Sequence, residues 1–154
     1  MAELTVGKKA PAFTLIDQHG KKVKLSDFAG KRVVVYFYPK ADTPGCTTQS
    51  CALRDAEPDL KKLKAVVIGI GPDSPERQAK FDDKYGLGFT LLADEEHDVA
   101  EKYGVWGEKV NYGRKYMGII RSAFVIDEAG KIAAAFYKIS PKDTIAQVTK
   151  ALKG

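Results

Sequence analysis

The chain has 154 residues, of which 44% are apolar and 29% charged, and its formal net charge at pH 7 is +5. This length fits a single domain, residues 1–154, that can bury a core without disulfide or metal staples, and the composition excludes the disordered and disulfide-scaffold classes. The lysines and arginines are spread among carboxylates rather than gathered in a run, so we expect no nucleic-acid partner.

Turn formers, helix caps and apolar runs predict strands and helices in alternation. The expected strands span residues 12–16, 22–25, 32–38, 65–70, 89–92, 119–126 and 131–137. The expected helical segments are one turn at 26–30, a long helix at 44–63, helices at 75–85 and 95–103, and a last helix capped by 140–143 and ending at 153. This order predicts an α/β fold with an N-terminal β-hairpin and a mixed central sheet flanked by helices.

The stretch that carries both cysteines begins with the strand 32–38, which shows no polar alternation after its first residue and is therefore predicted to be central. A hydroxyl residue at Thr43 and a proline at position 44 are typical of a helix start. Cys46 would then be about the third helical residue. Proline is unfavourable inside a helix, so because of Pro58 we expect the first helical piece to end at about residue 55, with a break or kink near Ala56 and a second piece through Leu63.

One segment shows no clear period. Residues 104–118 are rich in Gly, Lys and Tyr, and long segments of this kind are often functional or mobile. Turn formers at 127–130 then predict a hairpin between the last two strands.

Cys46 is the candidate nucleophile. A helix N-terminus carries roughly half a positive charge and free N–H groups, which stabilise a thiolate. The polar residues 47–50 argue against two cysteines that are merely buried in the core. No stretch reaches the ~20 apolar residues of a membrane span, and the first nine residues lack a signal-peptide core. We therefore expect a cytoplasmic protein with no membrane partner, in a compartment that keeps thiols reduced.

The spacing of Cys46 and Cys51 constrains their chemistry. Five residues along a helix give a rise of ~7.5 Å and place the two Cα atoms roughly 8 to 9 Å apart on different faces. A disulfide needs less than ~7 Å, so the two cysteines can pair only if the first turns of the helix unwind. Zinc sites usually have closer cysteines and further ligands, and the only histidines, His19 and His97, stand far away in sequence. We expect no metal and no cofactor.

A peroxide attacked by the Cys46 thiolate would develop charge on its leaving oxygen, which hydrogen-bond donors can stabilise. The Thr43 hydroxyl, the N–H groups near Cys46 and one arginine are candidates. Arg121 is the best arginine, because it is a charge inside an otherwise apolar predicted strand; the alternative is an edge-strand arginine that faces solvent. Thr43 could also serve only as a cap, and Pro39 only as a strand terminator.

At this point a resemblance is clear. Pro39-x-x-x-Thr43-x-x-Cys46 is similar to the peroxiredoxin active-site signature, and Cys51 as second cysteine resembles the bacterioferritin comigratory protein, or peroxiredoxin Q, subfamily. Further similar segments cover nearly the whole chain: 73–76, 84–87, 89–94, 103–109 and 118–122.

The resemblance implies a thioredoxin-like fold and a peroxidase that reduces hydrogen peroxide and alkyl hydroperoxides. In that interpretation Cys46 is peroxidatic, Cys51 is resolving and forms an intramolecular disulfide with it, Thr43 and Arg121 orient the peroxide, and Pro39 shields the pocket. The subfamily also implies a thioredoxin-type reductant and a monomer.

Two alternatives remain open. A thiol-disulfide oxidoreductase would share the fold, although its cysteines usually have two intervening residues rather than the four found here. A redox-regulated holdase or interaction protein would use the unwound helix to expose apolar surface to a partner.

Overall fold

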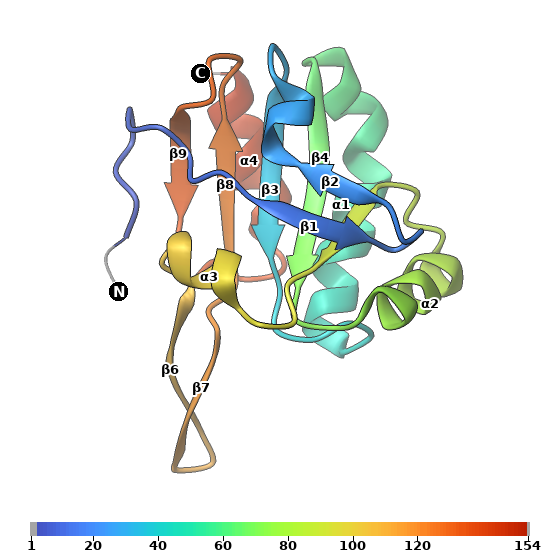
Figure 1. The fold of residues 1–154 in the computed structure, drawn as a ribbon, viewed down its shortest axis with the longest axis vertical. Helices are drawn as coiled ribbons and strands as arrows, with labels where there is room; N and C mark the ends of the chain where they lie inside the picture. Colours follow the sequence, from blue (N-terminus) through green and yellow to red (C-terminus); the bar gives the residue numbers. More distant parts are fainter. Residues whose placement is uncertain (1–2, 154) are drawn as a thin grey trace.

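The computed structural model describes residues 3–153, and a seven-stranded mixed sheet crosses it in the order β2-β1-β5-β4-β3-β8-β9 (Figure 1). Its strands are β1 (Thr14–Asp17), β2 (Lys22–Lys24), β3 (Arg32–Phe37), β4 (Ala65–Gly71), β5 (Thr90–Ala93), β8 (Ser122–Ile126) and β9 (Ile132–Phe136). The helices are η1 (Leu25–Phe28), α1 (Pro44–Lys62), α2 (Pro75–Tyr85), α3 (Asp98–Lys102) and α4 (Thr144–Lys153). The predicted mixed sheet and N-terminal hairpin are confirmed.

Strand β3 lies at the centre of the sheet, parallel to β4 and antiparallel to β8. Its alternate side chains enter two separate cores, because successive residues of a strand point to opposite faces. Val33, Val35 and Phe37 join the core beneath α3 and the N-terminal segment. Val34 and Tyr36 join the core beneath α1, α2 and α4. Both faces of β3 are therefore covered, as its unbroken apolar run predicts.

Helix α1 is longer and more regular than the sequence suggests. It continues through Ala56 and Pro58 without interruption, so the expected division into two helical pieces is wrong. Pro58 itself is exposed, while Leu53 and Leu60 on either side of it are fully buried against the sheet. We attribute the continuity to this packing, which outweighs the missing backbone hydrogen bond. Helix α3 is shorter than expected and begins at Asp98.

The segment without a clear period forms a second, two-stranded sheet. Its strands β6 (Trp106–Asn111) and β7 (Arg114–Ile119) pair antiparallel and extend away from the body of the molecule (Figure 1). Tyr112 and Gly113, both with positive φ, form the turn at its tip. Within residues 3–153 no helix is long and apolar enough to span a membrane.

Candidate active site

Cys46 lies at the start of helix α1, just after the loop that follows the central strand β3. The loop 38–43 leaves β3, and α1 begins at Pro44, so Cys46 is the third helical residue, as predicted. Its side chain is fully buried in the core beneath α1, beside Tyr36 and Tyr38. Both cysteines carry free thiols, and Cys51 is half-buried. The structure is therefore that of the reduced protein with the helix start folded.

Arg121 places its guanidinium against this thiol. Its Nη2 lies 3.4 Å from Cys46 Sγ, and its Nη1 donates a 2.8 Å hydrogen bond to Gln49 Oε1. A cation at this distance stabilises a thiolate. The sequence predicted Arg121 inside a strand, and this is wrong. It belongs to the two-residue connection between β7 and β8. Arg121 is only partly exposed, and the thiol and Gln49 hold its side chain towards the site.

Gln49 is a site residue that sequence reasoning missed. It is fully buried on α1, accepts from Arg121, and donates from Nε2 to Thr144 Oγ1 at 2.9 Å. Thr144 is also fully buried, and its hydroxyl donates to the Ser140 carbonyl at 3.0 Å. This chain of hydrogen bonds fixes the guanidinium from α4. The only sequence signal was the three-residue spacing of Gln49 from Cys46, which puts both on one side of the helix.

Gly45 leaves room for the guanidinium. A Cβ at this position would lie 3.0 Å from Arg121 Nη2 and 3.5 Å from Pro141 Cγ. The backbone of Gly45 has no positive φ, so its lack of a side chain is a matter of space rather than of conformation. The glycine therefore allows the arginine to approach the start of the helix.

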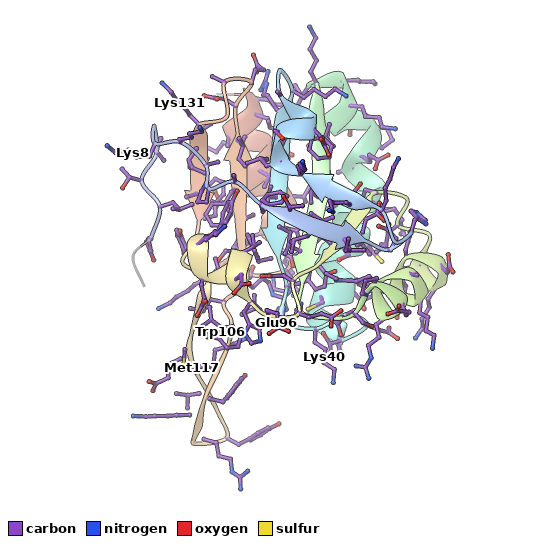
Figure 2. All side chains as sticks on the ribbon, in the orientation of Figure 1. Lys8, Lys40, Glu96, Trp106, Met117 and Lys131 are labelled. Carbon is purple, nitrogen blue, oxygen red and sulfur yellow. The ribbon has the colours of Figure 1, made fainter. Side chains whose placement is uncertain are left out.

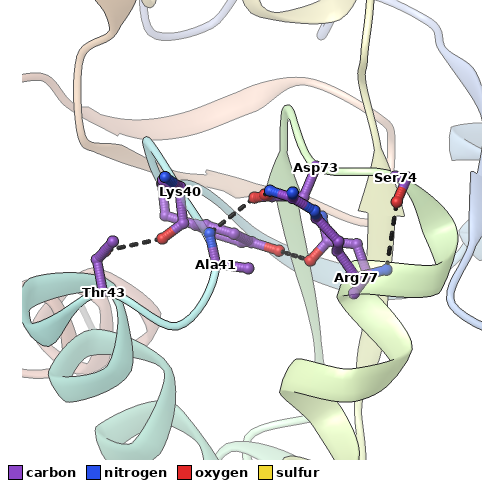
Figure 3. A network of polar contacts seen from close by, with 8 residues as sticks. Lys40, Ala41, Thr43, Asp73, Ser74 and Arg77 are labelled. Carbon is purple, nitrogen blue, oxygen red and sulfur yellow. Dashed lines mark hydrogen bonds and ion pairs between the residues drawn. The ribbon is translucent and has the colours of Figure 1, made fainter.

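The loop before α1 is held by polar contacts within itself and with Asp73, in the connection between β4 and α2 (Figure 3). The Ala41 N–H donates to the nearly buried carboxylate of Asp73 at 2.7 Å, and the Thr43 hydroxyl donates to the Lys40 carbonyl at 2.8 Å. Thr43 is at the N-cap position as predicted, but its side chain makes no capping hydrogen bond to the helix. Its oxygen lone pairs consequently remain available to a substrate, on the same loop as the half-buried Pro39.

Asp42 clamps the same loop to α2. Its carboxylate accepts hydrogen bonds from Lys84 Nζ, at 2.9 Å, and from the Tyr85 hydroxyl, at 2.7 Å. These two donors hold the pKa of Asp42 below its ordinary value. Asp42 has a positive φ of 58°, a conformation that Asp tolerates better than most residues. The clamp thus fixes a turn that the backbone alone would not favour.

Lys109 brings a second cation towards the site from strand β6. Its Nζ donates a 2.8 Å hydrogen bond to the carbonyl of Ile119, two residues before Arg121. Burial lowers the pKa of Lys109, the charge of Arg121 lowers it further, and the negative form of Cys46 acts in the opposite direction. The lysine therefore lies within electrostatic range of both groups. Sequence reasoning missed it, because a lysine in a segment without a clear period gives no sign of its direction.

The region around Cys51 is held by one buried hydrogen bond. The hydroxyls of Ser50 and Tyr36 lie 2.8 Å apart, and burial raises the pKa of Tyr36 well above its ordinary value. This contact joins the second turn of α1 to the central strand. Among residues 3–153, no three His, Cys, Asp or Glu side chains gather in a way that could hold a metal ion.

Comparison with known proteins identifies the family. The model of the AhpC/TSA family matches residues 6–135. The putative peroxiredoxin bcp of Haemophilus influenzae is 56% identical over 143 residues, which cover 93% of this chain and 92% of that protein. The peroxiredoxin Bcp of Bacillus subtilis is 47% identical over 97% of this chain and 96% of its own length. The chain belongs to the AhpC/TSA family, as a peroxiredoxin of the Bcp type.

Solved structures agree with this assignment. Peroxiredoxin Q of Xanthomonas campestris superposes with a TM-score of 0.89 at 32% identity and covers 96% of each chain. The bacterioferritin comigratory protein of the same organism, studied as trapped intermediate and ligand complexes for its alkyl peroxide reduction, gives a TM-score of 0.89 at 31% identity, over 97% of this chain and 98% of its own. The predicted thioredoxin-like fold and the peroxiredoxin resemblance are confirmed, and the chain is a thiol peroxidase.

Proposed function

We propose that Cys46 is the peroxidatic cysteine and that Cys51 resolves it. The observation that carries this assignment is the 3.4 Å contact between Arg121 Nη2 and Cys46 Sγ at the start of a helix. In this position the thiol lies both at the positive end of the helix and against a guanidinium, and both favour the thiolate that acts as nucleophile.

The first step is attack of the Cys46 sulfur on the distal oxygen of a hydroperoxide. The O–O bond breaks, the sulfur is oxidised to a sulfenic acid, and the leaving oxygen takes a proton to become water or an alcohol. The Thr43 hydroxyl, whose hydrogen is donated to the Lys40 carbonyl, would accept a hydrogen bond from the peroxide. The Arg121 guanidinium would donate to the leaving oxygen and stabilise the charge that develops there. Pro39 would limit access of water to the sulfur.

The second step needs the start of α1 to unwind, because Cys46 is buried and Cys51 lies on another face of the same helix. The Cys51 thiol then attacks the sulfenic sulfur, a disulfide forms within the chain, and the sulfenic oxygen leaves as water. A dithiol protein of the thioredoxin type reduces this disulfide by two successive exchanges and is itself oxidised.

The relatives guide the choice of substrate and setting. The Xanthomonas campestris protein is described by its alkyl peroxide reduction, and we propose alkyl hydroperoxides beside hydrogen peroxide as substrates of this chain. We further propose that it acts as a monomer in the cytoplasm, where reduced thiols are maintained.

The decisive experiment is stopped-flow peroxide consumption by the reduced protein, followed by thiol counting. We expect Cys46→Ser to lose peroxide consumption, and Cys51→Ser to consume one equivalent and stop as a sulfenic acid. The oxidised wild type should be a monomer without free thiols. Activity of Cys46→Ser close to the wild type refutes the assignment of the peroxidatic residue. A free thiol that persists in the oxidised wild type refutes the role of Cys51.

A further inference from the structure

The hairpin β6–β7 has an apolar surface of its own. The described residues contain five large apolar side chains that are exposed, and four of these lie on the hairpin: Val110 (64% exposed), Tyr112 (98%), Tyr116 (44%) and Met117 (53%). Figure 2 places Met117 on the hairpin that projects from the body of the molecule. We call these four side chains the hairpin patch. Exposed apolar groups concentrated in this way usually mark an interaction surface.

Pairing of the two strands distributes the patch over both faces of the hairpin. Val110 faces Lys115 and Met117 faces Glu108, while Tyr116 lies opposite Lys109 on the other face. Tyr112 extends from the turn at the tip. A two-stranded ribbon with so little buried surface is only marginally stable alone. A partner that covers both faces and the tip would bury the apolar groups that the fold leaves in water.

The charge of the hairpin restricts the kind of partner. Residues 106–119 contain three basic side chains, Lys109, Arg114 and Lys115, and one carboxylate, Glu108. Lys115 lies 3.7 Å from that carboxylate, so Arg114 beside the tip has no ion-pair partner among the described residues. An acidic surface would complement this excess of positive charge, whereas a second copy of the same hairpin would be repelled by it.

The base of the hairpin leads directly into the active site. Strand β7 ends at Ile119, whose carbonyl accepts from Lys109, and Arg121 follows two residues later with its guanidinium on Cys46. A protein that covers the hairpin from its tip to its base would therefore reach the loop and helix start that carry the reactive sulfur. Of the molecules in the reaction cycle, the reductant is the one that must approach this place as a protein.

We propose that the hairpin patch is the docking surface for the dithiol reductant, a protein with an acidic surface around its own cysteines. This proposal rests on the disulfide cycle described above. Small dithiols such as dithiothreitol need no docking surface. They can reduce the same disulfide, so the two kinds of reductant separate docking from chemistry.

The test compares peroxide turnover with a bacterial thioredoxin and with dithiothreitol. The variant combines Tyr112→Asn, which suits the positive φ of that position, with Met117→Ser. Truncating side chains at the centre of an interface often costs more than ~1 kcal/mol, so we expect the KM for thioredoxin to rise roughly five- to tenfold. Turnover with dithiothreitol should stay at the wild-type value. Arg114→Glu should also raise the KM for thioredoxin, and added salt should reduce this effect.

Val6→Ser is the matched control, because Val6 is 59% exposed and precedes Gly7, whose N–H bonds to Ile132 at the end of the sheet remote from Arg121. It should leave both assays unchanged. A wild-type KM for thioredoxin in the hairpin variant overturns the proposal. So does an equal loss with both reductants, or a wild-type dimer that the hairpin substitutions dissociate. A wild type that is inactive with dithiothreitol as well refutes the disulfide cycle itself.

Discussion

Replacing Gly45 by alanine should separate the stability of the protein from its activity. Gly45 is the second residue of α1, and alanine there loses less conformational entropy on folding, which stabilises a helix by about 0.5 to 1 kcal/mol. The new Cβ would lie 3.0 Å from Arg121 Nη2, tighter than an ordinary contact. We therefore expect the thermal midpoint to rise or stay constant while peroxide reduction slows.

The size of the kinetic effect follows from how the guanidinium is held. Gln49 fixes Nη1 at 2.8 Å, so Arg121 can yield to the methyl group mainly by moving Nη2, which contacts Cys46 Sγ at 3.4 Å. Hydrogen bonds to charged groups contribute about 1.5 to 3 kcal/mol, and a displacement of a few tenths of an ångström would remove about 1 kcal/mol of this. Because 1.36 kcal/mol corresponds to a tenfold change in rate, the rate constant should fall about fivefold.

Stopped-flow reduction of hydrogen peroxide by the pre-reduced protein measures this rate constant without a reductase. Thr48→Ala is the matched control, since Thr48 is exposed on the same helix, bonds only to the Pro44 carbonyl, and also gains helix propensity. The control should gain stability without losing rate. A wild-type rate for Gly45→Ala would refute the argument that the position of the Arg121 guanidinium limits the reaction.

Three further predictions concern groups around the site. Ser50→Ala leaves the buried Tyr36 hydroxyl without its partner and should cost about 1 to 3 kcal/mol in urea unfolding; adding Tyr36→Phe should recover part of that loss, and strictly additive losses would contradict it. Lys109→Met should raise the thermal midpoint at pH 7, because burial lowers the pKa of that lysine and so disfavours its charged form in the folded protein. The wild type then gains stability as the pH rises towards ~10.4, so the difference between the two midpoints should shrink over that range. Lys115→Met should show neither effect. Asp42→Asn should destabilise the protein at pH 7 but not at a pH well below ~4, since the lowered pKa of this carboxyl gives stability that disappears on protonation, and equal midpoints at pH 7 would refute the clamp.

The main elements of the sheet could be read from the sequence because their burial is uniform. The apolar runs at 32–38 and 65–70 have no polar face, so they allow only a position covered on both sides, and β3 and β4 occupy it. The ends of helix α2 could also be predicted from the sequence. Ser74 accepts from the Arg77 N–H, and Gly86 ends the helix with a φ of 57°. Local chemistry decides such boundaries.

The hairpin β6–β7 could not be predicted, because it buries little on either face. Alternation of polar and apolar residues arises when one side of a strand meets a core, and here Val110, Tyr116 and Met117 are all exposed. The missing period was a true property of the segment, but it reflects a ribbon in solvent rather than irregular chain.

Some residues of the site could be predicted from the sequence and others could not. Cys46, Thr43 and Pro39 are close in sequence, so the helix-start signature places all three near one another. Gln49 and Thr144 are distant in sequence and meet only when α4 packs beside α1. A buried glutamine among polar neighbours is indistinguishable in sequence from one on a solvated helix face. The support behind the arginine therefore required the tertiary structure.

The start of α1 is held by contacts that the reaction itself weakens. In the reduced protein, the guanidinium of Arg121 lies 3.4 Å from Cys46 Sγ, and Ser50 ties the next turn to the central strand. In the proposed cycle Cys46 reacts as a thiolate, and its oxidation to the sulfenic acid removes that negative charge, so a charge-assisted contact with Arg121 becomes an ordinary one, roughly half as strong. Beyond Cys51 the helix is anchored by Leu53, which is fully buried and takes no part in the chemistry. We therefore expect unwinding to follow oxidation and to stop before Leu53. The eight residues 44–51 would then carry the nucleophile in the folded state and the disulfide in the unwound state.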